Sequence, residues 1–323
     1  MAELKGIRGV YLGHAHDIEI VTGVTVILCP AGLSAGIDIR GSATSTRQID
    51  SLSANHLISK IHAVCLSGGS AYGLGAGSGV MKFLKDNGYG FGMKELPVPI
   101  VPTGVIFDLA IGKREICDYE TLGYKACIDA MDGKRILEGS VGAGTGATVG
   151  KFFGIEHAMK GGMGISKRSL SDGLCVYAIA VVNCFGDVVD PDTKRIIAGA
   201  RKTKSGKRFA NTYRLYLRGK ERAIPPFSHT NTNTTLGAII TNAKLDKQQA
   251  TLVSRMAQAA VVKTISPAHT IYDGDMIFTI ASGEIETDPH IVGVLGEEAL
   301  KAAILRAINK AASIGNIPSI RSL

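Results

Sequence analysis

Glycine is spread through the apolar segments of this chain, and it constrains the possible folds more than any other residue type does. There are 40 glycines among the 323 residues, without the three-residue period of collagen. Because glycine lacks a Cβ atom, it allows tight turns and lets another backbone approach closely. We therefore expect a fold with many short turns and closely packed elements.

Apolar, β-branched segments alternate along the chain with segments of helical periodicity. The expected strands are 21–29, 36–40, 61–66, 97–107, 174–183, 236–241 and 276–281. The expected helices are 71–87, 119–132, 246–262 and 297–312, with Asp246 as the N-cap of the third. A long polar connector spans 191–233. This order of elements predicts an α/β or α+β protein.

The composition is that of a globular protein, with 45% hydrophobic and 20% charged residues. No apolar run reaches the roughly 18 residues that a membrane-spanning helix needs. The N-terminal stretch MAELKGIRGV also lacks the apolar core of a secretory signal. The six cysteines form no CxxC pair, and most lie beside apolar residues, which is typical of reduced core thiols. These features predict a cytoplasmic protein without a membrane partner.

The positive charge is concentrated in one segment. Residues 201–222 contain nine Lys and Arg residues against a single acid, Glu221, so this segment accounts for the formal net charge of +8. A basic surface of this kind could bind nucleic acid. However, the segment has no zinc-finger or RRM signature and no stacking platform of aromatic residues. We therefore favour a solvated basic surface loop without a nucleic-acid partner.

Two glycine-rich stretches and one histidine pair invite cofactor interpretations that the sequence does not support. Residues 73–79 lack the third glycine of a dinucleotide fingerprint and the acidic residue that follows it. Residues 142–151 have Thr145 in place of a Walker A glycine, and Phe152 where a hydroxyl would hold magnesium. His14 and His16 could share one face of a strand, but no third metal ligand is evident. We expect neither a metal nor an organic cofactor.

The segment TNTNTTLGAIITNAKL, residues 230–245, contains the best candidate for a catalytic residue. Here a polar connector runs directly into Asn233-Thr234-Thr235 and then into an apolar strand. If the bond before Thr234 is cut, its hydroxyl becomes an N-terminal nucleophile. The freed α-amine, with an ordinary pKa of about 7.7–8.0, can then act as the general base. The alternative interpretation is an ordinary Asn/Thr loop that caps a strand.

Four polar residues elsewhere could complete such a site. Asp273 and Asp275 flank a glycine just before an apolar strand, and two carboxylates on one turn can orient an ammonium group. Lys151 ends a glycine-rich loop, and Asn183 ends the longest apolar strand, where an amide or ammonium donor could stabilise an oxyanion. Each of these also has a purely structural interpretation, as an acidic turn, a surface lysine or a strand-terminating asparagine.

The sequence resembles the self-processing aminopeptidase/D-amidase-esterase family, which includes β-peptidyl aminopeptidases and endo-type nylon-oligomer hydrolases. The matching stretches follow one another along almost the whole chain, at 36–52, 62–84, 98–109, 138–151, 160–170, 180–190 and 233–245. The Asn-Thr-Thr junction with the two downstream aspartates is closest to the nylon-oligomer hydrolases. Aminopeptidase members have a tyrosine near the oxyanion, whereas the corresponding stretch here offers Phe107.

The resemblance implies a single αββα four-layer sandwich, similar to N-terminal nucleophile hydrolases but with different connectivity. It implies cleavage between Asn233 and Thr234 into an α chain, 1–233, and a β chain, 234–323. Thr234 would then be the nucleophile and Asn183 the oxyanion-hole amide, with Lys151, Asp273 and Asp275 as supporting groups. The implied substrate is a small peptide or amide, and the implied assembly is a homotetramer. The alternative is a non-catalytic binding protein of the same fold that uses the basic surface loop 201–222.

Overall fold

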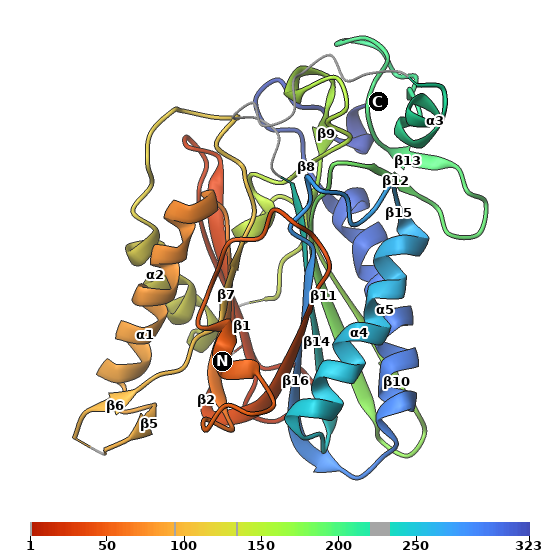
Figure 1. The fold of residues 1–323 in the computed structure, drawn as a ribbon. Coiled ribbons are helices and arrows are strands. Elements are labelled where there is room, and N and C mark those ends of the chain that lie inside the picture. The colour runs from red at the N-terminus through yellow and green to blue at the C-terminus, as the bar shows by residue number, and fades with distance from the viewer. Residues whose placement is uncertain (1, 94, 134, 220–232) are drawn as a thin grey trace.

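The computed structural model describes residues 2–93, 95–133, 135–219 and 233–323 (Figure 1). Its largest element within these ranges is a hydrogen-bonded sheet of nine strands, eight of which follow one another in a single path. The strand order is β10-β11-β14-β16-β2-β4-β7-β3, and β1 pairs with β2 beside this path. The strands are β1 (Tyr11–Asp17), β2 (Thr22–Ile39), β3 (Thr46–Arg47), β4 (Ile61–Ser67), β7 (Thr103–Val105), β10 (Gly162–Ser169), β11 (Cys175–Asn183), β14 (Thr234–Ala243) and β16 (Met276–Ile285).

The long strand β2 divides this path into two sheet layers. Its first part pairs with β1 and β4 through residues 22–28, and its last part pairs with β16 through residues 34–39. The register shifts between Leu28 and Leu33, where the strand passes from one layer to the other. The first layer therefore contains β1, β3, β4 and β7, and the second contains β10, β11, β14 and β16.

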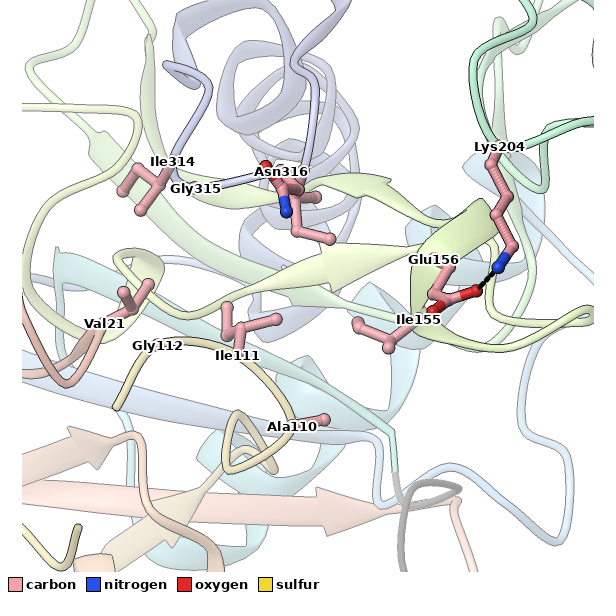
Figure 2. A pocket seen from close by; sticks show the side chains of 11 residues that line it. Val21, Ala110, Ile111, Gly112, Ile155, Glu156, Lys204, Ile314, Gly315 and Asn316 are labelled. Atoms are coloured by element: carbon pink, nitrogen blue, oxygen red, sulfur yellow. Dashed lines mark ion pairs between the residues drawn. The ribbon is translucent and has the colours of Figure 1, made fainter. Parts of the chain in front are cut away.

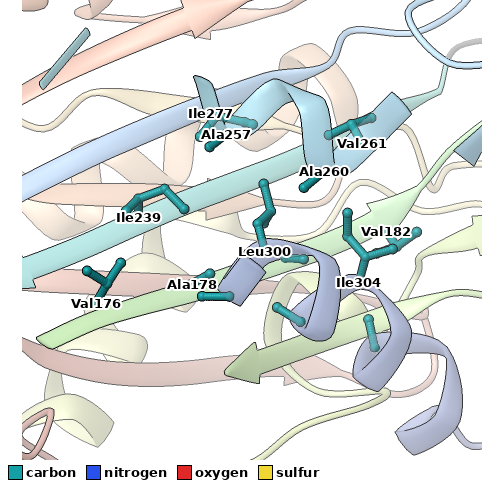
Figure 3. Close-up of a cluster of buried hydrophobic side chains, with 14 of the residues drawn as sticks. Val176, Ala178, Val182, Ile239, Ala257, Ala260, Val261, Ile277, Leu300 and Ile304 are labelled. Atoms are coloured by element: carbon teal, nitrogen blue, oxygen red, sulfur yellow. The ribbon is translucent and has the colours of Figure 1, made fainter. Parts of the chain in front are cut away.

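Helices cover the outer face of each layer, so the fold is an αββα sandwich as expected (Figure 1). Helices α1 (Ala76–Asp86) and α2 (Tyr119–Met131) pack on the first layer. Helices α4 (Lys247–Thr264) and α5 (Pro289–Lys310) pack on the second. Figure 3 shows Ala257 and Val261 of α4 and Leu300 and Ile304 of α5 facing the strands. The core between the two layers includes Leu12, Ile27, Leu66, Ile179, Leu236 and Phe278.

Two glycines show why the chain needs so many of them. A Cβ atom on Gly13 of β1 would lie 2.1 Å from the Ala126 carbonyl oxygen of α2. A Cβ on Gly164 of β10 would lie 2.1 Å from the Ala303 carbonyl oxygen of α5. Both distances are far below van der Waals contact, so only glycine allows a helix to lie this close to each sheet layer.

The remaining described elements are short and lie mostly at the ends of the sandwich. They are β5 (Phe91–Gly92), β6 (Pro97–Val98), β8 (Thr148–Val149), β9 (Met159–Lys160), β12 (Asp187–Val189), β13 (Ile196–Ala198), β15 (Ile265–Ser266) and α3 (Thr212–Leu217). The 3₁₀ turns span Ile49–Leu52, Ser70–Gly75, Gly142–Gly144, Ile155–His157 and Ile320–Ser322. No helix among the described residues is long and apolar enough to cross a membrane.

Several expected element bounds were wrong. The segments 21–29 and 36–40 belong to one strand, β2, and the stretch 97–107 contains only the short strands β6 and β7. The helix expected from residue 71 opens with a 3₁₀ turn, so that α1 begins at Ala76. Helix α5 begins at Pro289 rather than 297, because Asp288 caps it and a proline fits the first helical turn. The cap of α4 by Asp246 is confirmed, as a capping box with Gln249.

Candidate functional site

Thr234 is the first residue of β14. This end of the strand lies beside the turn that precedes β16. Thr234 pairs with Asn183, the last residue of β11, and is only 3% exposed. In the uncut chain its Oγ1 lies 2.5 Å from the carbonyl oxygen of Asn233, to which it donates. The hydroxyl is therefore already beside the carbonyl group that precedes it.

The turn 272–275 holds the residue before Thr234. The Asn233 N–H donates to the Tyr272 carbonyl at 2.8 Å, and the Gly274 N–H donates to the Asn233 carbonyl at 2.7 Å. The Asn233 carbonyl oxygen thus accepts from both Gly274 and Thr234. The bond from the Gly274 N–H polarises this carbonyl toward attack at its carbon, as a donor does in an oxyanion hole, and the bond from Thr234 keeps the hydroxyl next to that carbonyl.

The two aspartates of this turn have separate sets of donors. Asp273 accepts from the Phe185 N–H at 3.0 Å, from the Thr270 hydroxyl at 2.5 Å and from the Thr270 N–H at 3.2 Å. Asp275 accepts through Oδ1 from the Thr235 N–H at 2.7 Å. Its Oδ2 accepts from the His269 N–H at 3.2 Å and lies 3.0 Å from His269 Nδ1.

Burial shifts the pKa of Asp273 in the uncut chain. Loss of solvent, together with the neighbouring Asp275, raises the pKa of Asp273 to about 7. The sequence interpretation placed both carboxylates against an ammonium group, which would keep them ionised. That amine exists only after the bond before Thr234 is cut, so in the uncut chain Asp273 binds a proton more readily than an exposed aspartate does.

Lys151 and Asn183 form a single unit at the end of β11. Lys151 Nζ donates to the Asn183 backbone carbonyl at 2.9 Å and to its Oδ1 at 2.8 Å. The Thr148 N–H also donates to Oδ1, at 3.0 Å, and Asn183 Nδ2 donates to the Phe107 carbonyl at 3.2 Å. Burial lowers the pKa of Lys151 to about 7, although nearby Cys184 and Asp273 act in the opposite direction. The side-chain amide of Asn183 is therefore held with its oxygen toward Lys151.

Lys160 supports this unit from β9, and the sequence analysis assigned it no role. Its fully buried Nζ donates to the carbonyls of Thr145 and Ala147, both at 2.7 Å. Burial lowers the pKa of Lys160 to about 7, and Asp108 partly offsets this effect. The signal in the sequence is a lone lysine in the apolar and glycine-rich stretch AMKGGMG, where a charged side chain needs buried partners.

Asp108 is a second acid that the sequence analysis missed. It accepts from the Thr22 hydroxyl at 2.8 Å and from the Gly69 N–H at 2.7 Å. Burial raises the pKa of this carboxyl to about 6. It directly follows Phe107, whose carbonyl accepts from Asn183, so the acid belongs to the surroundings of the same site.

The structure therefore brings together every residue selected from the sequence. Asn183 pairs with Thr234, Lys151 contacts Asn183, and Asp275 contacts the amide next to Thr234. Asp273 lies beside Asn233 through a parallel bridge. The residues missed were His269, Gly274, Lys160 and Asp108. Gly274 lies between the two selected aspartates, and the sequence analysis assigned no role in the site to any of the four.

The histidines and the basic segment have other environments. Within the described ranges, no group of three His, Cys, Asp or Glu side chains is placed to hold a metal. His14 Nδ1 lies 3.0 Å from the Thr25 hydroxyl, and burial lowers the pKa of His14 to about 4.

Most of the described basic segment is exposed to solvent, namely Lys202, Lys204, Lys207, Arg208, Arg214 and Arg218. Arg201 was wrongly included in the expected solvated loop, because it is buried and donates to the Glu156 carbonyl at 2.8 Å. Residues 220–222 lie outside the described part.

A cavity of about 440 Å³ opens next to the segment that follows Phe107 (Figure 2). Its walls are largely apolar, and an ion pair between Glu156 and Lys204 lies on one side. The lining residues are Val21, Ala110, Ile111, Gly112, Ile155, Glu156, Lys204, Ile314, Gly315, Asn316 and Ile317. Gly154, which precedes Ile155, donates its N–H to the Lys151 carbonyl at 3.0 Å. Two walls of the cavity thus belong to the segments that directly follow Phe107 and Lys151.

Comparison with known proteins places this geometry in a family. The profile of peptidase family S58 matches residues 3–316. The chain is 34% identical to an uncharacterized aminopeptidase of Mycobacterium leprae, over 99% of this chain and 93% of that protein. It is 31% identical to a 6-aminohexanoate-oligomer endohydrolase of Paenarthrobacter ureafaciens, over 93% of this chain and 80% of that protein.

Solved structures with the same fold include two aminopeptidases. A β-aminopeptidase of Burkholderia superposes with a TM-score of 0.65 at 19% identity, covering 94% of this chain and 85% of that one. The L-aminopeptidase D-Ala-esterase/amidase of Ochrobactrum anthropi superposes with a TM-score of 0.67 at 15% identity, covering 97% and 87%. The latter is described as a new variant of the Ntn hydrolase fold. At these identities the likeness shows the shared fold.

Proposed function

The chain belongs to peptidase family S58 and is an amide-bond hydrolase, and on this premise we propose that Thr234 is its nucleophile and first cuts the chain before itself. The observation that carries the proposal is the position of Thr234 Oγ1, 2.5 Å from the Asn233 carbonyl oxygen. Family membership favours this enzyme over a non-catalytic binding protein of the same fold.

In the maturation step, Thr234 Oγ1 attacks the carbonyl carbon of Asn233, and the bond from that carbon to the Thr234 nitrogen breaks. The hydroxyl proton goes to the departing nitrogen, and an ester joins Asn233 to Thr234 Oγ1. Water then hydrolyses this ester, leaving a carboxylate on Asn233 and a free amine on Thr234. The Gly274 N–H supports the charge that develops on the carbonyl oxygen.

In the hydrolysis of a substrate, the same hydroxyl attacks an amide carbonyl. The Thr234 amine accepts the hydroxyl proton and transfers it to the leaving amine, giving an acyl-enzyme ester that water cleaves. Asn183, oriented by Lys151, is the proposed oxyanion donor. Removing one such donor costs about 3–4 kcal/mol of transition-state stabilisation in comparable enzymes. Asp273 and Asp275 are proposed to orient the new amine.

The proposed substrate is a small peptide or an oligoamide of ω-amino acids. The names of the two relatives, aminopeptidase and 6-aminohexanoate-oligomer endohydrolase, both describe amide-bond hydrolases. The largely apolar cavity with a charged pair on one side suits a substrate with an apolar spacer and a charged end. Its walls at Ala110 and Ile155 follow Phe107 and Lys151 within a few residues, which keeps them within roughly 15 Å of Asn183.

Denaturing electrophoresis with mass spectrometry tests the proposal. Cleavage before Thr234 gives chains of 233 and 90 residues, about 24 and 9 kDa of the 33.9 kDa total. Thr234→Ala should abolish both cleavage and amide hydrolysis, whereas Thr234→Ser should keep part of each because the hydroxyl remains. Two fragments from Thr234→Ala would remove Thr234 from the mechanism.

The cytoplasmic location and the homotetramer are also proposals. The tetramer rests on the resemblance of the sequence to its family, and light scattering coupled to size-exclusion chromatography would measure the mass directly. Fractionation of cells that express the native chain would test the location.

A further inference from the structure

His269 contacts Asp275, one of the two carboxylates of the site. No motif in the sequence predicted this contact. His269 lies in the loop between β15 and β16, with its side chain 20% exposed. Its backbone N–H and its Nδ1 both approach Asp275 Oδ2, at 3.2 and 3.0 Å. Because Oδ2 already accepts from the His269 N–H and Oδ1 accepts from the Thr235 N–H, this carboxyl acts as an acceptor, and we assign Nδ1 as the donor.

Asp275 is thereby fixed between two segments. Its Oδ2 is bound twice by His269, and its Oδ1 accepts from the Thr235 N–H at 2.7 Å. The side chain of Asp275 is only 2% exposed, so solvent contributes little to its orientation. The direction of the carboxylate therefore depends on these donors.

The backbone of His269 has a conformation that few residue types tolerate well. Its φ is +54°, in the left-handed region that Asn, Asp, His and Gly tolerate better than most residues. Within the described part of the chain, the buried Nε2 atom has no hydrogen-bond partner, so the ring makes its hydrogen bond to Asp275 through Nδ1. The next residue, Thr270, gives both its donors to Asp273. Two consecutive residues thus orient the two carboxylates.

We propose that His269 is a positioning residue, which aims Asp275 at the Thr234 amine that self-cleavage releases. This inference rests on the proposed function, because that amine exists only in the cut enzyme. Thr235 directly follows Thr234, so the carboxylate that binds the Thr235 N–H lies next to the new N-terminus. Because the amine is formed after the cut, His269 should affect substrate hydrolysis more than self-cleavage.

The matched pair His269→Asn and His269→Asp tests this role. Asn and Asp both tolerate the left-handed backbone, and their side chains have the same shape as each other. Only Asn offers an N–H near the position that Nδ1 occupies in the wild type. We expect His269→Asn to keep kcat within about threefold of the wild type. We expect His269→Asp to lose about 10- to 100-fold in kcat, since small misplacements of a catalytic group are costly. KM should change little in either variant, and the cut fraction should stay high.

A second comparison uses chemical rescue. His269→Gly removes the ring and keeps both the backbone donor and the φ angle, and imidazole in the assay should restore part of its kcat. The proposal is overturned if His269→Asp or His269→Gly hydrolyses amides at the wild-type rate. It is also overturned if His269→Asn is as impaired as His269→Asp, because the donor would then not matter.

Thr234→Ala in the same assays separates the two levels of inference. An uncut and inactive Thr234→Ala protein beside a fully active His269→Asp variant would refute only the role of His269. A Thr234→Ala protein that still hydrolyses amides would refute the proposed function itself.

Discussion

At the scale of single residues, the site depends on backbone donors and on buried polar side chains that are hydrogen-bonded. The Asn233 carbonyl is held by the Gly274 N–H, and Asn183 is held by Lys151. Lys151 and Lys160 are both buried with their hydrogen bonds satisfied by oxygen atoms. Because each group has a dedicated partner, small changes at these positions should alter chemistry or stability in specific ways.

Gly274→Ala should slow self-cleavage at least about tenfold. An added Cβ would lie 2.8 Å from Thr234 Oγ1 and 2.8 Å from the Ala43 carbonyl oxygen, so the nucleophile or the turn must move. A displacement of about 1 Å at a reacting group can cost about a hundredfold in rate. The cut fraction at successive times after cell-free synthesis measures the effect.

Gly75→Ala is the matched control for this substitution, because it has φ −60° and its nearest contact for a Cβ is 3.9 Å away. It should be cut at the wild-type rate. Equal rates for Gly274→Ala and the wild type would show that the contact with Thr234 does not matter for cleavage.

At the scale of elements, glycines set the distance between each helix and its sheet layer. Helix α5 lies against β10 at Gly164, and α2 lies against β1 at Gly13. These contacts involve backbone atoms, which cannot turn aside as a flexible side chain can. The elements that carry Thr234 and Asn183 are part of the layer that α5 covers.

Gly164→Ala should therefore destabilise the fold by about 1–3 kcal/mol or more, the usual cost of overpacking a core. Its Cβ would meet the Ala303 carbonyl oxygen at 2.1 Å and the Ala307 nitrogen at 2.5 Å, so α5 must shift outward. Urea denaturation followed by circular dichroism gives the change in free energy of unfolding. An unchanged midpoint would contradict the close packing of α5 on β10.

At the scale of the whole molecule, the proposed cut does not separate the two parts of the fold. Strand β14 would begin the 90-residue chain, yet it pairs with β11, and β16 pairs with β2 of the other chain. Both pairings lie inside the second sheet layer, between α4, α5 and the inter-sheet core. The proposed cleavage would thus leave one interdigitated domain.

The two chains should consequently elute together from a native size-exclusion column, although they separate on a denaturing gel. The buried apolar surfaces of β14 and β16 would otherwise be exposed to water, which is strongly unfavourable. Electrophoresis of the native peak measures this. A separate native peak of the 90-residue chain would contradict the pairing of β14 with β11.

The buried lysines also predict how stability changes with pH. Burial lowers the pKa of Lys160 from 10.5 to about 7, so between these values the unfolded chain binds the proton and the folded chain does not. The free energy of unfolding therefore rises with pH in this window, by up to about 1.4 kcal/mol per pH unit for each such group. Lys160→Met should reduce this slope between pH 7 and 10.

Urea denaturation at pH 7, 8 and 9 measures the slope for both proteins. Lys160→Met will also lower stability at every pH, because the Thr145 and Ala147 carbonyls lose their donor. The slope is independent of that constant loss. Equal slopes in the two proteins would show that Lys160 keeps its proton in the folded state.

Local sequence patterns were sufficient to predict the features that depend on neighbouring residues. The cap at Asp246, the apolar strand ending at Asn183 and the polar junction before β14 follow from local periodicity and turn chemistry. The candidates Thr234, Asn183, Lys151, Asp273 and Asp275 could be selected because each ends or begins a recognisable element. The resemblance to the family supplied the expectation of an αββα sandwich.

Contacts between groups that lie far apart in the sequence became evident only from the folded chain. Strand β2 passes between the two layers because it pairs with β4 in one and with β16 in the other. Its own sequence predicts two separate strands. The contacts of Gly274 with Asn233 and of Lys160 with Thr145 join segments without a shared motif. His269 likewise became a candidate only because the structure places its ring against the buried carboxylate of Asp275. Hydrogen bonds and burial depend on positions in space, and local sequence patterns carry no information about those distances.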